Sequence, residues 1–194
     1  MLHMEKWFPA DSMTIMIVDD TKENINVLRR TLTTVGCRIS VALNGKMALD
    51  LIPKLKPDLV LLDVMMPEMD GYEVCRRLKE NPDLQNIPVI FITAKGDIED
   101  VVEGFEAGAV DFIMKPFRQE EVLARVRTHL TLSAALKKLI QDSETDPLTG
   151  LFNRRTFMKR IENEAARFKR SKKPFSILFG DIDFFKKIND TFGH

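Results

Sequence analysis

One stretch of the chain decides the fold prediction, and it reads Asp58-Leu59-Val60-Leu61-Leu62-Asp63-Val64-Met65-Met66-Pro67-Glu68-Met69-Asp70-Gly71. Its first part is an uninterrupted apolar run that ends at an acid, Asp63. A short apolar run without polar alternation is typical of a strand buried on both faces of a parallel sheet. The part that follows ends at Gly71, where we expect a turn before a helix, with the glycine at positive φ. The stretch therefore predicts a buried strand whose carboxyl end presents a carboxylate.

Four further runs of the same kind surround this one. The full set of predicted strands is Thr14–Val18, Arg38–Ala42, Leu59–Val64, Val89–Thr93 and Val110–Met114. Apolar residues at helical spacing follow each of the first four runs, as Ile25, Leu28 and Leu32 do after the first. Strands that alternate with single helices predict an α/β fold, a doubly wound five-stranded parallel sheet with helices on both faces.

A long helix is expected to close this domain, from Gln119 to about Gln141. Its second half places Leu132, Leu136 and Leu139 at spacings of four and three, the start of a heptad-like stripe. The pattern fits either a plain amphipathic final helix or a helix that packs on the domain and then projects. We favour the second interpretation, with residues 118–142 as a final helix that extends into a linker.

The amino-acid composition disfavours several classes of protein. The 194 residues are 44% hydrophobic and 30% charged, with a formal net charge of +0, which disfavours a disordered, collagenous or membrane-spanning chain. The two cysteines, Cys37 and Cys75, suggest neither a disulfide scaffold nor a zinc site, so we expect a reducing, cytoplasmic location. Residues 1–12 lack the apolar core of a signal peptide and are interpreted as a loose leader before a domain at 13–132. We expect no membrane association.

Charge is unevenly distributed along the chain. Residues 1–142 carry 18 Lys and Arg against 22 Asp and Glu, whereas residues 143–194 carry 11 against 7. A basic segment attracts phosphates, but a solvated helix face is the simpler interpretation, and we expect no nucleic-acid partner.

Polar side chains gather where the predicted strands end. Asp19 and Asp20 follow the first strand and Asp63 ends the third, so the three acids should converge at the carboxyl edge of the sheet. Their repulsion would be relieved by a hard divalent cation such as Mg²⁺, although Asp19 and Asp20 alone could also cap the next helix. Thr93 and Lys115 reach the same edge and suit the oxygens of a phosphoryl group.

These residues resemble the receiver domain of bacterial two-component response regulators, which has a flavodoxin-like fold. The resemblance rests on Asp19-Asp20, on residues 58–71, on Thr93-Ala94 and on Asp111-Phe112-Ile113-Met114-Lys115-Pro116-Phe117. It implies that Asp63 is the phosphoacceptor and that Asp19, Asp20, Asp63 and the backbone carbonyl of Met65 hold Mg²⁺. It further implies that Thr93 and Lys115 bind the phosphoryl group and that Phe112 turns inward on activation. The implied partners are a sensor histidine kinase or phosphotransfer protein and, on phosphorylation, a second copy of the chain.

A second unit is expected after the turn formers at residues 143–150. It offers a helix from Asn153 to about Arg170 and an apolar strand, Phe175–Phe179, followed by Asp181. Two blocks resemble the N-terminal part of a GGDEF domain, the diguanylate cyclase that makes cyclic dimeric GMP from two GTP. They are Asp146-Pro147-Leu148-Thr149-Gly150-Leu151-Phe152-Asn153-Arg154-Arg155 and Asp181-Ile182-Asp183-Phe184-Phe185-Lys186-Lys187-Ile188-Asn189-Asp190-Thr191-Phe192-Gly193-His194.

The second resemblance implies an output site for GTP. Asp181 and the carbonyl of Ile182 would hold Mg²⁺, Asn189 would read the guanine edge, and Phe184 and Phe185 would shape its pocket. Residues 143–194 contain no Gly-Gly-Asp/Glu-Glu-Phe signature. We therefore expect an incomplete α/β cyclase domain that is inactive in this chain and belongs to a longer parent protein.

The sequence is compatible with three candidate functions, which differ in how well the motifs support them. The first is a response regulator whose phosphorylated receiver controls a cyclase output through the helical linker. The second is a stand-alone receiver that acts as a phosphorylation-dependent docking module. The third, an Asp-nucleophile hydrolase, is disfavoured because its first strand should end in Asp-x-Asp, whereas Asp19 and Asp20 are adjacent.

Overall fold

A computed structural model of the chain describes residues 13–94, 98–181 and 183–193. The predicted leader at 1–12 lies outside the described residues, as does Ile182. Two compact units are present, divided between Leu139 and Ile140. None of the helices within the described ranges is long and apolar enough to cross a membrane.

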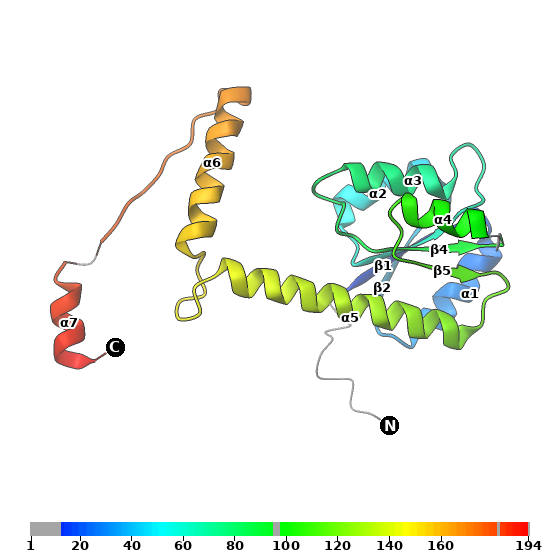
Figure 1. Cartoon of the computed structure of the whole chain (residues 1–194), viewed down its shortest axis with the longest axis horizontal. Coiled ribbons are helices and arrows are strands. Elements are labelled where there is room, and N and C mark those ends of the chain that lie inside the picture. The colour runs from blue at the N-terminus through cyan, green and yellow to red at the C-terminus, as the bar shows by residue number, and fades with distance from the viewer. Residues whose placement is uncertain (1–12, 95–97, 182, 194) are drawn as a thin grey trace. The chain divides into compact units, whose positions relative to one another are not determined.

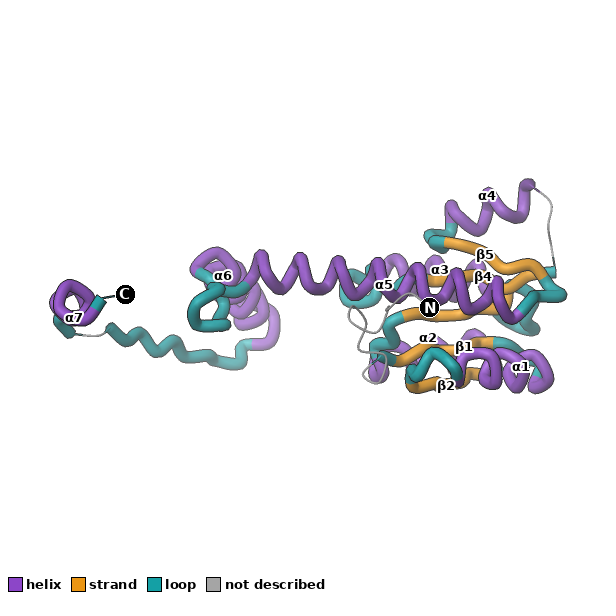
Figure 2. Tube along the Cα trace, turned by 90° about the horizontal axis from the view of Figure 1, so that it is seen from below, coloured by secondary structure: helices purple, strands orange, loops and turns teal. Residues whose placement is uncertain are grey.

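The first unit is a five-stranded sheet with the order β2-β1-β3-β4-β5, in which all neighbouring strands are parallel. Figures 1 and 2 show the strands enclosed between helices. Its elements are β1 Thr14–Val18, α1 Lys22–Thr33, β2 Arg38–Ala42, α2 Gly45–Leu55, β3 Leu59–Asp63, α3 Gly71–Glu80, β4 Val89–Thr93, α4 Ile98–Glu106, β5 Asp111–Met114 and α5 Gln119–Glu144. The prediction of a doubly wound parallel sheet is confirmed.

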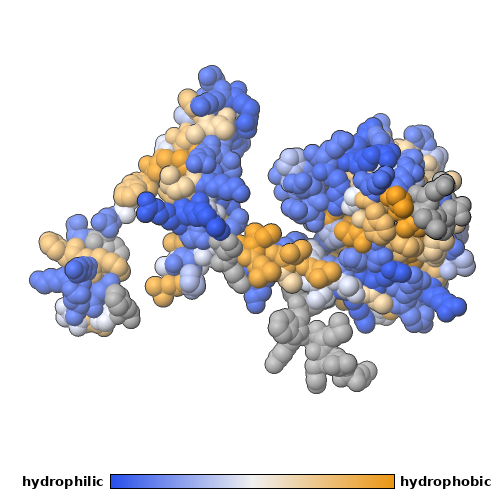
Figure 3. All heavy atoms as spheres, in the orientation of Figure 1, coloured by the Kyte–Doolittle hydropathy of each residue, from blue (hydrophilic) through white to orange (hydrophobic). Residues whose placement is uncertain are grey.

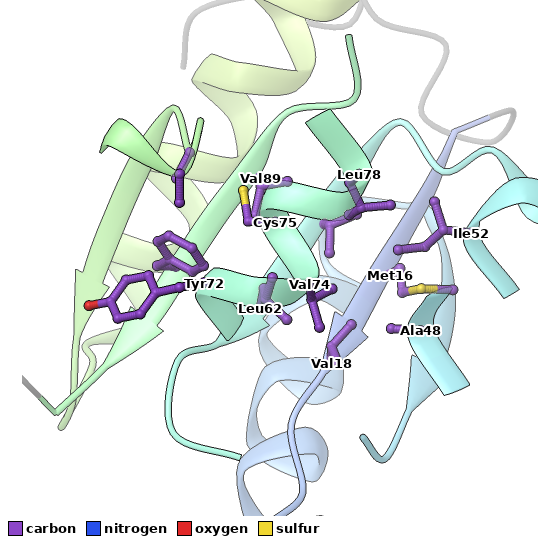
Figure 4. Close-up of a cluster of buried hydrophobic side chains, with 14 of the residues drawn as sticks. Met16, Val18, Ala48, Ile52, Leu62, Tyr72, Val74, Cys75, Leu78 and Val89 are labelled. Atoms are coloured by element: carbon purple, nitrogen blue, oxygen red, sulfur yellow. The ribbon is translucent and has the colours of Figure 1, made fainter. Parts of the chain in front are cut away.

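Two apolar cores, one on each face of the sheet, explain the continuous apolar strands. In β1, Met16 and Val18 face α2 and α3, whereas Ile15 and Ile17 face α1 and α5. The labelled side chains of Figure 4 show the first of these cores. Each fully buried Leu or Ile adds about 1.5–3 kcal/mol to the free energy of unfolding. Because both faces of the strands are covered, polar alternation has no place in them.

Apolar side chains of helix α5 are buried in its first half, and leucine side chains are exposed in its second half. Val122, Val126 and Leu130 in its first half are fully buried against the sheet. In its second half Leu132, Leu136 and Leu139 are 53%, 60% and 65% exposed, and apolar atoms gather on the surface of this region in Figure 3.

One ion pair holds the second half of α5 to the first unit. The Lys137 ammonium donates to Oδ1 of Asp58, which also accepts the Thr14 amide at 2.8 Å through Oδ2. Asp58 stands just before β3, at the edge of the sheet opposite the carboxylate cluster. This polar contact adds to the packing of Ala134 against the core in holding the second half of α5 to the sheet, while the leucine stripe stays exposed.

The second unit contains α6 Arg154–Ser171 and α7 Phe185–Phe192. A tight turn precedes α6, in which Oδ1 of Asp146 accepts the backbone amide and the hydroxyl of Thr149 at 2.9 and 2.8 Å. Asn153 caps α6, since its side chain accepts the amide of Thr156 at 3.0 Å. The helix predicted from Asn153 to about Arg170 is thus confirmed.

The strand predicted at Phe175–Phe179 is wrong for this structure, because no strand is assigned there. The segment is exposed, with Leu178 at 98% and Phe179 at 90%. A strand is stabilised by hydrogen bonds to a neighbour and by burial of at least one face. Within the described part of the second unit the only β-bridge joins Thr145 and Phe152, so this apolar run lacks a partner strand.

Candidate functional site

The predicted site residues lie at the carboxyl ends of neighbouring strands. Asp19 follows β1, Asp63 ends β3, Thr93 ends β4 and Lys115 follows β5. The register pairs Val18 with Leu62, Asp63 with Ile92, and Thr93 with Met114. Since the strand order is β1-β3-β4-β5 at this point, the sheet brings all four side chains to one edge.

Three carboxylates form a compact cluster at this edge. Each of Asp19, Asp20 and Asp63 offers an oxygen, and these three oxygens lie within 4.8 Å of one another. Asp19 and Asp63 are buried, whereas Asp20 is exposed. Neither Asp19 nor Asp20 caps α1, because that helix begins at Lys22 with Thr21 as its N-cap residue. The helix-cap alternative is therefore excluded, and the acids remain available as oxygen ligands.

The Lys115 ammonium lies between two of these acids. Its Nζ atom donates to Oδ2 of Asp63 at 2.7 Å and to Oδ2 of Asp19 at 3.2 Å. The backbone amide of Lys115 donates to the Thr93 carbonyl at 2.7 Å. This bond places the start of the lysine side chain beside the end of β4. A single ammonium thus opposes three carboxylates in the cluster.

Burial sets the electrostatics of Asp63. Burial and the neighbouring Asp19 charge raise the pKa of Asp63 above its usual value, and the bonds from Lys115 and the Met65 amide only partly offset this. For Lys115, burial lowers the pKa, but the hydrogen bonds and charges of Asp63 and Asp19 outweigh it and raise the pKa overall. Lys115 therefore stays charged, and the Asp63 carboxyl group lies in a partly desolvated site together with two other acids.

The donor set fits a hard divalent cation. Carboxylate oxygens are the ligands that Mg²⁺ prefers, and an excess of negative charge remains in the cluster after Lys115 is counted. Met65 follows in the same loop, where its amide donates to Oδ1 of Asp63 at 3.3 Å. The resemblance to receiver domains implies the Met65 carbonyl as a further ligand.

Gly71 acts differently from the sequence prediction. It does not have positive φ; the left-handed residue of this loop is Glu68, at φ 66°. A Cβ atom on Gly71 would lie 2.3 Å from the Asp63 carbonyl oxygen and 2.9 Å from the Val64 Cα atom. The glycine is required because the start of α3 packs directly on the backbone of β3, the strand that ends at Asp63.

Thr93 and Phe112 line a small cavity behind the site. Thr93 is buried and Phe112 is half-buried, with its ring 6.1 Å from that of Phe105 in an edge-on arrangement. This cavity measures about 10 Å³, room for about one water molecule, opens partly to solvent and is also lined by Tyr72 and Phe91. A phenyl ring therefore enters this space only if neighbouring groups move.

Sequence reasoning missed several polar contacts around the site. The amide of Asn24 donates to both oxygens of Asp19, and the Tyr72 hydroxyl donates to the carbonyl of Asp100 at 3.1 Å. Asn24 stands in the first turn of a helix, where a polar residue normally indicates only solvent exposure. No local pattern distinguishes it from its neighbours.

Asp111 anchors α5 to β5, a further link that the sequence did not indicate. Its Oδ1 atom accepts from Arg125 at 2.6 Å and from the Phe112 amide at 2.9 Å, and its Oδ2 atom lies 3.1 Å from Nε2 of His129. Burial raises the pKa of Asp111, but the Arg125, Phe112 and His129 bonds outweigh it and lower the pKa below its usual value.

We expect Asp111→Asn to lower the free energy of unfolding by about 1 kcal/mol near pH 7, because it weakens charge-assisted bonds at a partly exposed position. A carboxyl with a lowered folded pKa stabilises the fold above its unfolded pKa of about 3.9 and stops doing so as the pH falls through the folded value. Urea unfolding should therefore show a cost near pH 7 that shrinks near pH 3. Asp50→Asn, on an exposed position of α2, is the control. An Asp111→Asn cost that is equal at both pH values contradicts the argument.

The predicted output residues lie at the surface of the second unit. Phe184 and Phe185 are 81% and 52% exposed, and Asp181 is exposed as well. Asn189 lies in α7 and is half-buried, and Ile182 lies outside the described residues. Asp181, Phe184 and Phe185 are thus exposed in this structure, whereas Asn189 is partly covered.

Comparisons with known protein families assign both parts of the chain. The response regulator receiver domain matches residues 15–127, and the diguanylate cyclase GGDEF domain matches residues 143–194. Among solved structures, the receiver domain of a signal transduction histidine kinase from Syntrophus aciditrophicus is 40% identical, with a TM-score of 0.58. That match covers 62% of this chain and 91% of the other.

Two curated relatives extend the comparison. A Vibrio cholerae protein named "Probable cyclic di-GMP phosphodiesterase" is 48% identical over 117 residues, 60% of this chain and 26% of that protein. Response regulator PleD of Caulobacter vibrioides is 41% identical over 130 residues, 67% of this chain and 29% of its own length. This chain therefore spans less than a third of either relative. Because the receiver match covers more than half of the chain and contains the whole carboxylate cluster, this chain belongs to the response regulator receiver domain family.

Proposed function

We propose that the first unit is a phosphorylation switch in which Asp63 accepts a phosphoryl group. The observation that carries this proposal is the contact of Lys115 with Asp63 at 2.7 Å and with Asp19 at 3.2 Å. A buried carboxylate at the edge of a parallel sheet, flanked by an ammonium and by two more acids, suits nucleophilic attack on phosphorus. It also explains why so much negative charge is gathered in one place.

The reaction follows from the positions of the side chains. An Asp63 oxygen forms a bond to phosphorus, while the bond from phosphorus to the donor nitrogen or oxygen breaks and the donor leaves with that electron pair. Lys115 stays charged and contacts the transferred oxygens, and Thr93 binds another of them. Mg²⁺ would be held by Asp19, Asp20, Asp63 and the Met65 carbonyl, and it would supply positive charge that screens the carboxylates from the phosphoryl group. We place this reaction in the cytoplasm, with a histidine kinase or phosphotransfer protein as the donor.

The conformational response is expected at Thr93 and Phe112. A phosphoryl group on Asp63 adds nearly two negative charges and draws the Thr93 hydroxyl toward it. That movement would enlarge the cavity of about 10 Å³ between the two side chains and let Phe112 turn inward. Phe112 lies on β5, next to Asp111 and the Arg125 contact of α5, so its movement reaches the face from which α5 extends.

For the output we propose a diguanylate cyclase. The support is the GGDEF match over residues 143–194. The two curated relatives share the receiver region but carry names that differ, so the receiver alone does not specify an output. In the complete domain Asp181 and the Ile182 carbonyl would bind Mg²⁺, while Asn189, Phe184 and Phe185 would bind the guanine of GTP. The alternative is a docking module without enzymatic output, and the observation that supports it is the exposure of Phe184 and Phe185.

The central proposal is tested by measuring the intact mass after incubation with Mg²⁺ and acetyl phosphate. The chain should gain one phosphoryl group, and hydroxylamine should release it, because hydroxylamine cleaves acyl phosphates and leaves serine and threonine esters intact. A chain that gains no phosphoryl group, or that keeps it after hydroxylamine, argues against Asp63 as the acceptor.

We also propose that the phosphorylated chain dimerises through the leucine stripe of α5, defined as Leu132, Leu136 and Leu139. Light scattering with Mg²⁺ and beryllofluoride, a phosphoryl mimic, should show the mass of a dimer. Leu136→Glu should weaken dimerisation at least tenfold, because it places a charge in the apolar seam of a helix pair. Lys138→Glu introduces the same residue two positions later, on the opposite side of the helix, and should leave dimerisation intact. Equal effects of the two variants would contradict the stripe as the contact.

A further inference from the structure

The Asp19 carboxylate is held more tightly than any other acid described in the cluster. Its Oδ1 atom accepts the Thr21 amide at 2.8 Å and the Asn24 side-chain amide at 3.1 Å. Its Oδ2 atom accepts the same Asn24 amide at 3.0 Å and Lys115 at 3.2 Å. Asp19 is fully buried. Four hydrogen bonds therefore surround one carboxylate, and Asn24 is the donor that contacts both of its oxygens.

The two oxygens of Asp19 differ in what surrounds them. Among the described residues, Oδ1 accepts from its own loop and from α1, whereas Oδ2 accepts from α1 and from Lys115, which also donates to Asp63. Oδ2 is thus the oxygen that faces the reacting carboxylate. A donor that contacts both oxygens fixes the rotation of the carboxylate about its Cβ–Cγ bond, so that the same oxygen stays turned toward Asp63.

Asn24 is itself well anchored. It lies in the first turn of α1, where the next residue, Ile25, is buried and its amide donates to the Thr21 carbonyl at 3.2 Å. The first turn of α1 is therefore fixed to the loop that carries Asp19 and to the core beneath it. An amide placed on such a turn orients its partner at little cost in side-chain entropy.

We propose that Asn24 is a positioning residue for the cation site. By fixing the plane of the Asp19 carboxylate, it presents Oδ2 to the cation and keeps Oδ1 turned away, and so sets the affinity for Mg²⁺. Partners that hydrogen-bond a metal ligand typically change metal affinity by about 10- to 100-fold when they are removed. This inference rests on the proposed function, because it requires a cation at the carboxylate cluster.

The test is calorimetric titration of the full chain with Mg²⁺, without any phosphoryl donor. Asn24→Ala should raise the Kd for Mg²⁺ about tenfold or more, and Asn24→Ser, which keeps one short donor, should give an intermediate value. Asn26→Ala is the matched control, since Asn26 is exposed on the same helix, and it should bind Mg²⁺ as the parent chain does. Thermal unfolding of each variant without Mg²⁺ separates an effect on the fold from an effect on the site.

The possible outcomes separate a failure of the Asn24 inference from a failure of the proposed function. If the parent chain binds Mg²⁺ and Asn24→Ala binds it equally well, Asn24 has only a structural role and the inference is overturned, while the proposed function stands. A lowered melting temperature with an unchanged Kd leads to the same conclusion. If the parent chain does not bind Mg²⁺ at all, both the inference and the cation in the proposed function fail. A raised Kd in Asn24→Ala with a normal value in Asn26→Ala supports the inference.

Discussion

Replacing Asp63 with asparagine is expected to abolish phosphorylation and every change that follows from it. The amide cannot act as the anionic nucleophile, and it removes one of the three carboxylates that lie within 4.8 Å of one another. Intact mass after treatment with acetyl phosphate and Mg²⁺ should show no added group. Light scattering with beryllofluoride should show no shift to a dimer.

The same variant should be more stable than the parent chain near pH 7. Burial raises the pKa of Asp63, with the Asp19 charge adding to it, so the ionised group opposes folding. Stability linked to such a group is fully present below its unfolded pKa and is lost as the pH rises through the folded pKa. Asparagine avoids this loss, and urea unfolding near pH 7 should therefore give a higher midpoint for Asp63→Asn in the absence of Mg²⁺.

Asp58→Asn is the matched control, because Asp58 stands just before the same strand at its opposite end. Its contacts are with Thr14 and Lys137, far from the carboxylate cluster. This variant should still accept one phosphoryl group. Phosphorylation of Asp63→Asn at a normal level, or equal loss in both variants, would show that the acceptor lies elsewhere.

Gly71→Ala is expected to be strongly destabilising, because Gly71 begins α3 directly against the end of β3. The added Cβ atom would lie 2.3 Å from the carbonyl oxygen of Asp63 and 2.9 Å from the Val64 Cα atom, and both are backbone atoms that cannot rotate away. Overpacking of this kind typically costs about 1–3 kcal/mol and sometimes more. We expect about 3 kcal/mol, measured by urea unfolding.

The Gly71→Ala substitution should also displace the Asp63 side chain at the end of β3. Relief of the contact requires α3 and the end of β3 to separate, and the amide of Gly71 donates to the Val64 carbonyl at 2.9 Å across this contact. Mg²⁺ affinity should therefore fall together with stability, even in the fraction that folds.

Gly104→Ala is the control for this prediction. It also adds a methyl group to a helix, but the nearest atom is the edge of the Phe91 ring at 3.2 Å, a milder contact that involves a side chain and no backbone atom. The gain in helix propensity, about 1 kcal/mol, should offset much of that contact. If Gly71→Ala unfolds at the same urea concentration as Gly104→Ala, then the close approach of α3 to β3 does not constrain the strand.

The fold was predictable because its signals are local. Five apolar runs with helical spacing between them require a parallel sheet covered on both faces, and the two cores around β1 agree with this. The carboxylate cluster was also predictable, since the carboxyl ends of neighbouring parallel strands meet at one edge. No long-range information was needed to place Asp19, Asp63, Thr93 and Lys115 together.

Other features depended on neighbours that the local pattern does not reveal. The strand predicted at Phe175–Phe179 did not form, because a strand requires a hydrogen-bonded neighbour and the described part of the second unit offers none there. Gly71 was expected to serve a positive φ, whereas it is needed because a Cβ atom there would lie 2.3 Å from the Asp63 carbonyl oxygen of another element.

Periodicity and residue type, both visible in the sequence, indicate the strands, their alternation with helices and the set of acids, threonine and lysine at the strand ends. Tertiary structure alone decided which oxygen of Asp19 faces Asp63, which glycine leaves room for a backbone, and which side of α5 remains exposed. These depend on contacts between elements distant in sequence, such as Lys115 with Asp19 or Lys137 with Asp58. Such contacts are fixed to within an ångström only when the whole core packs.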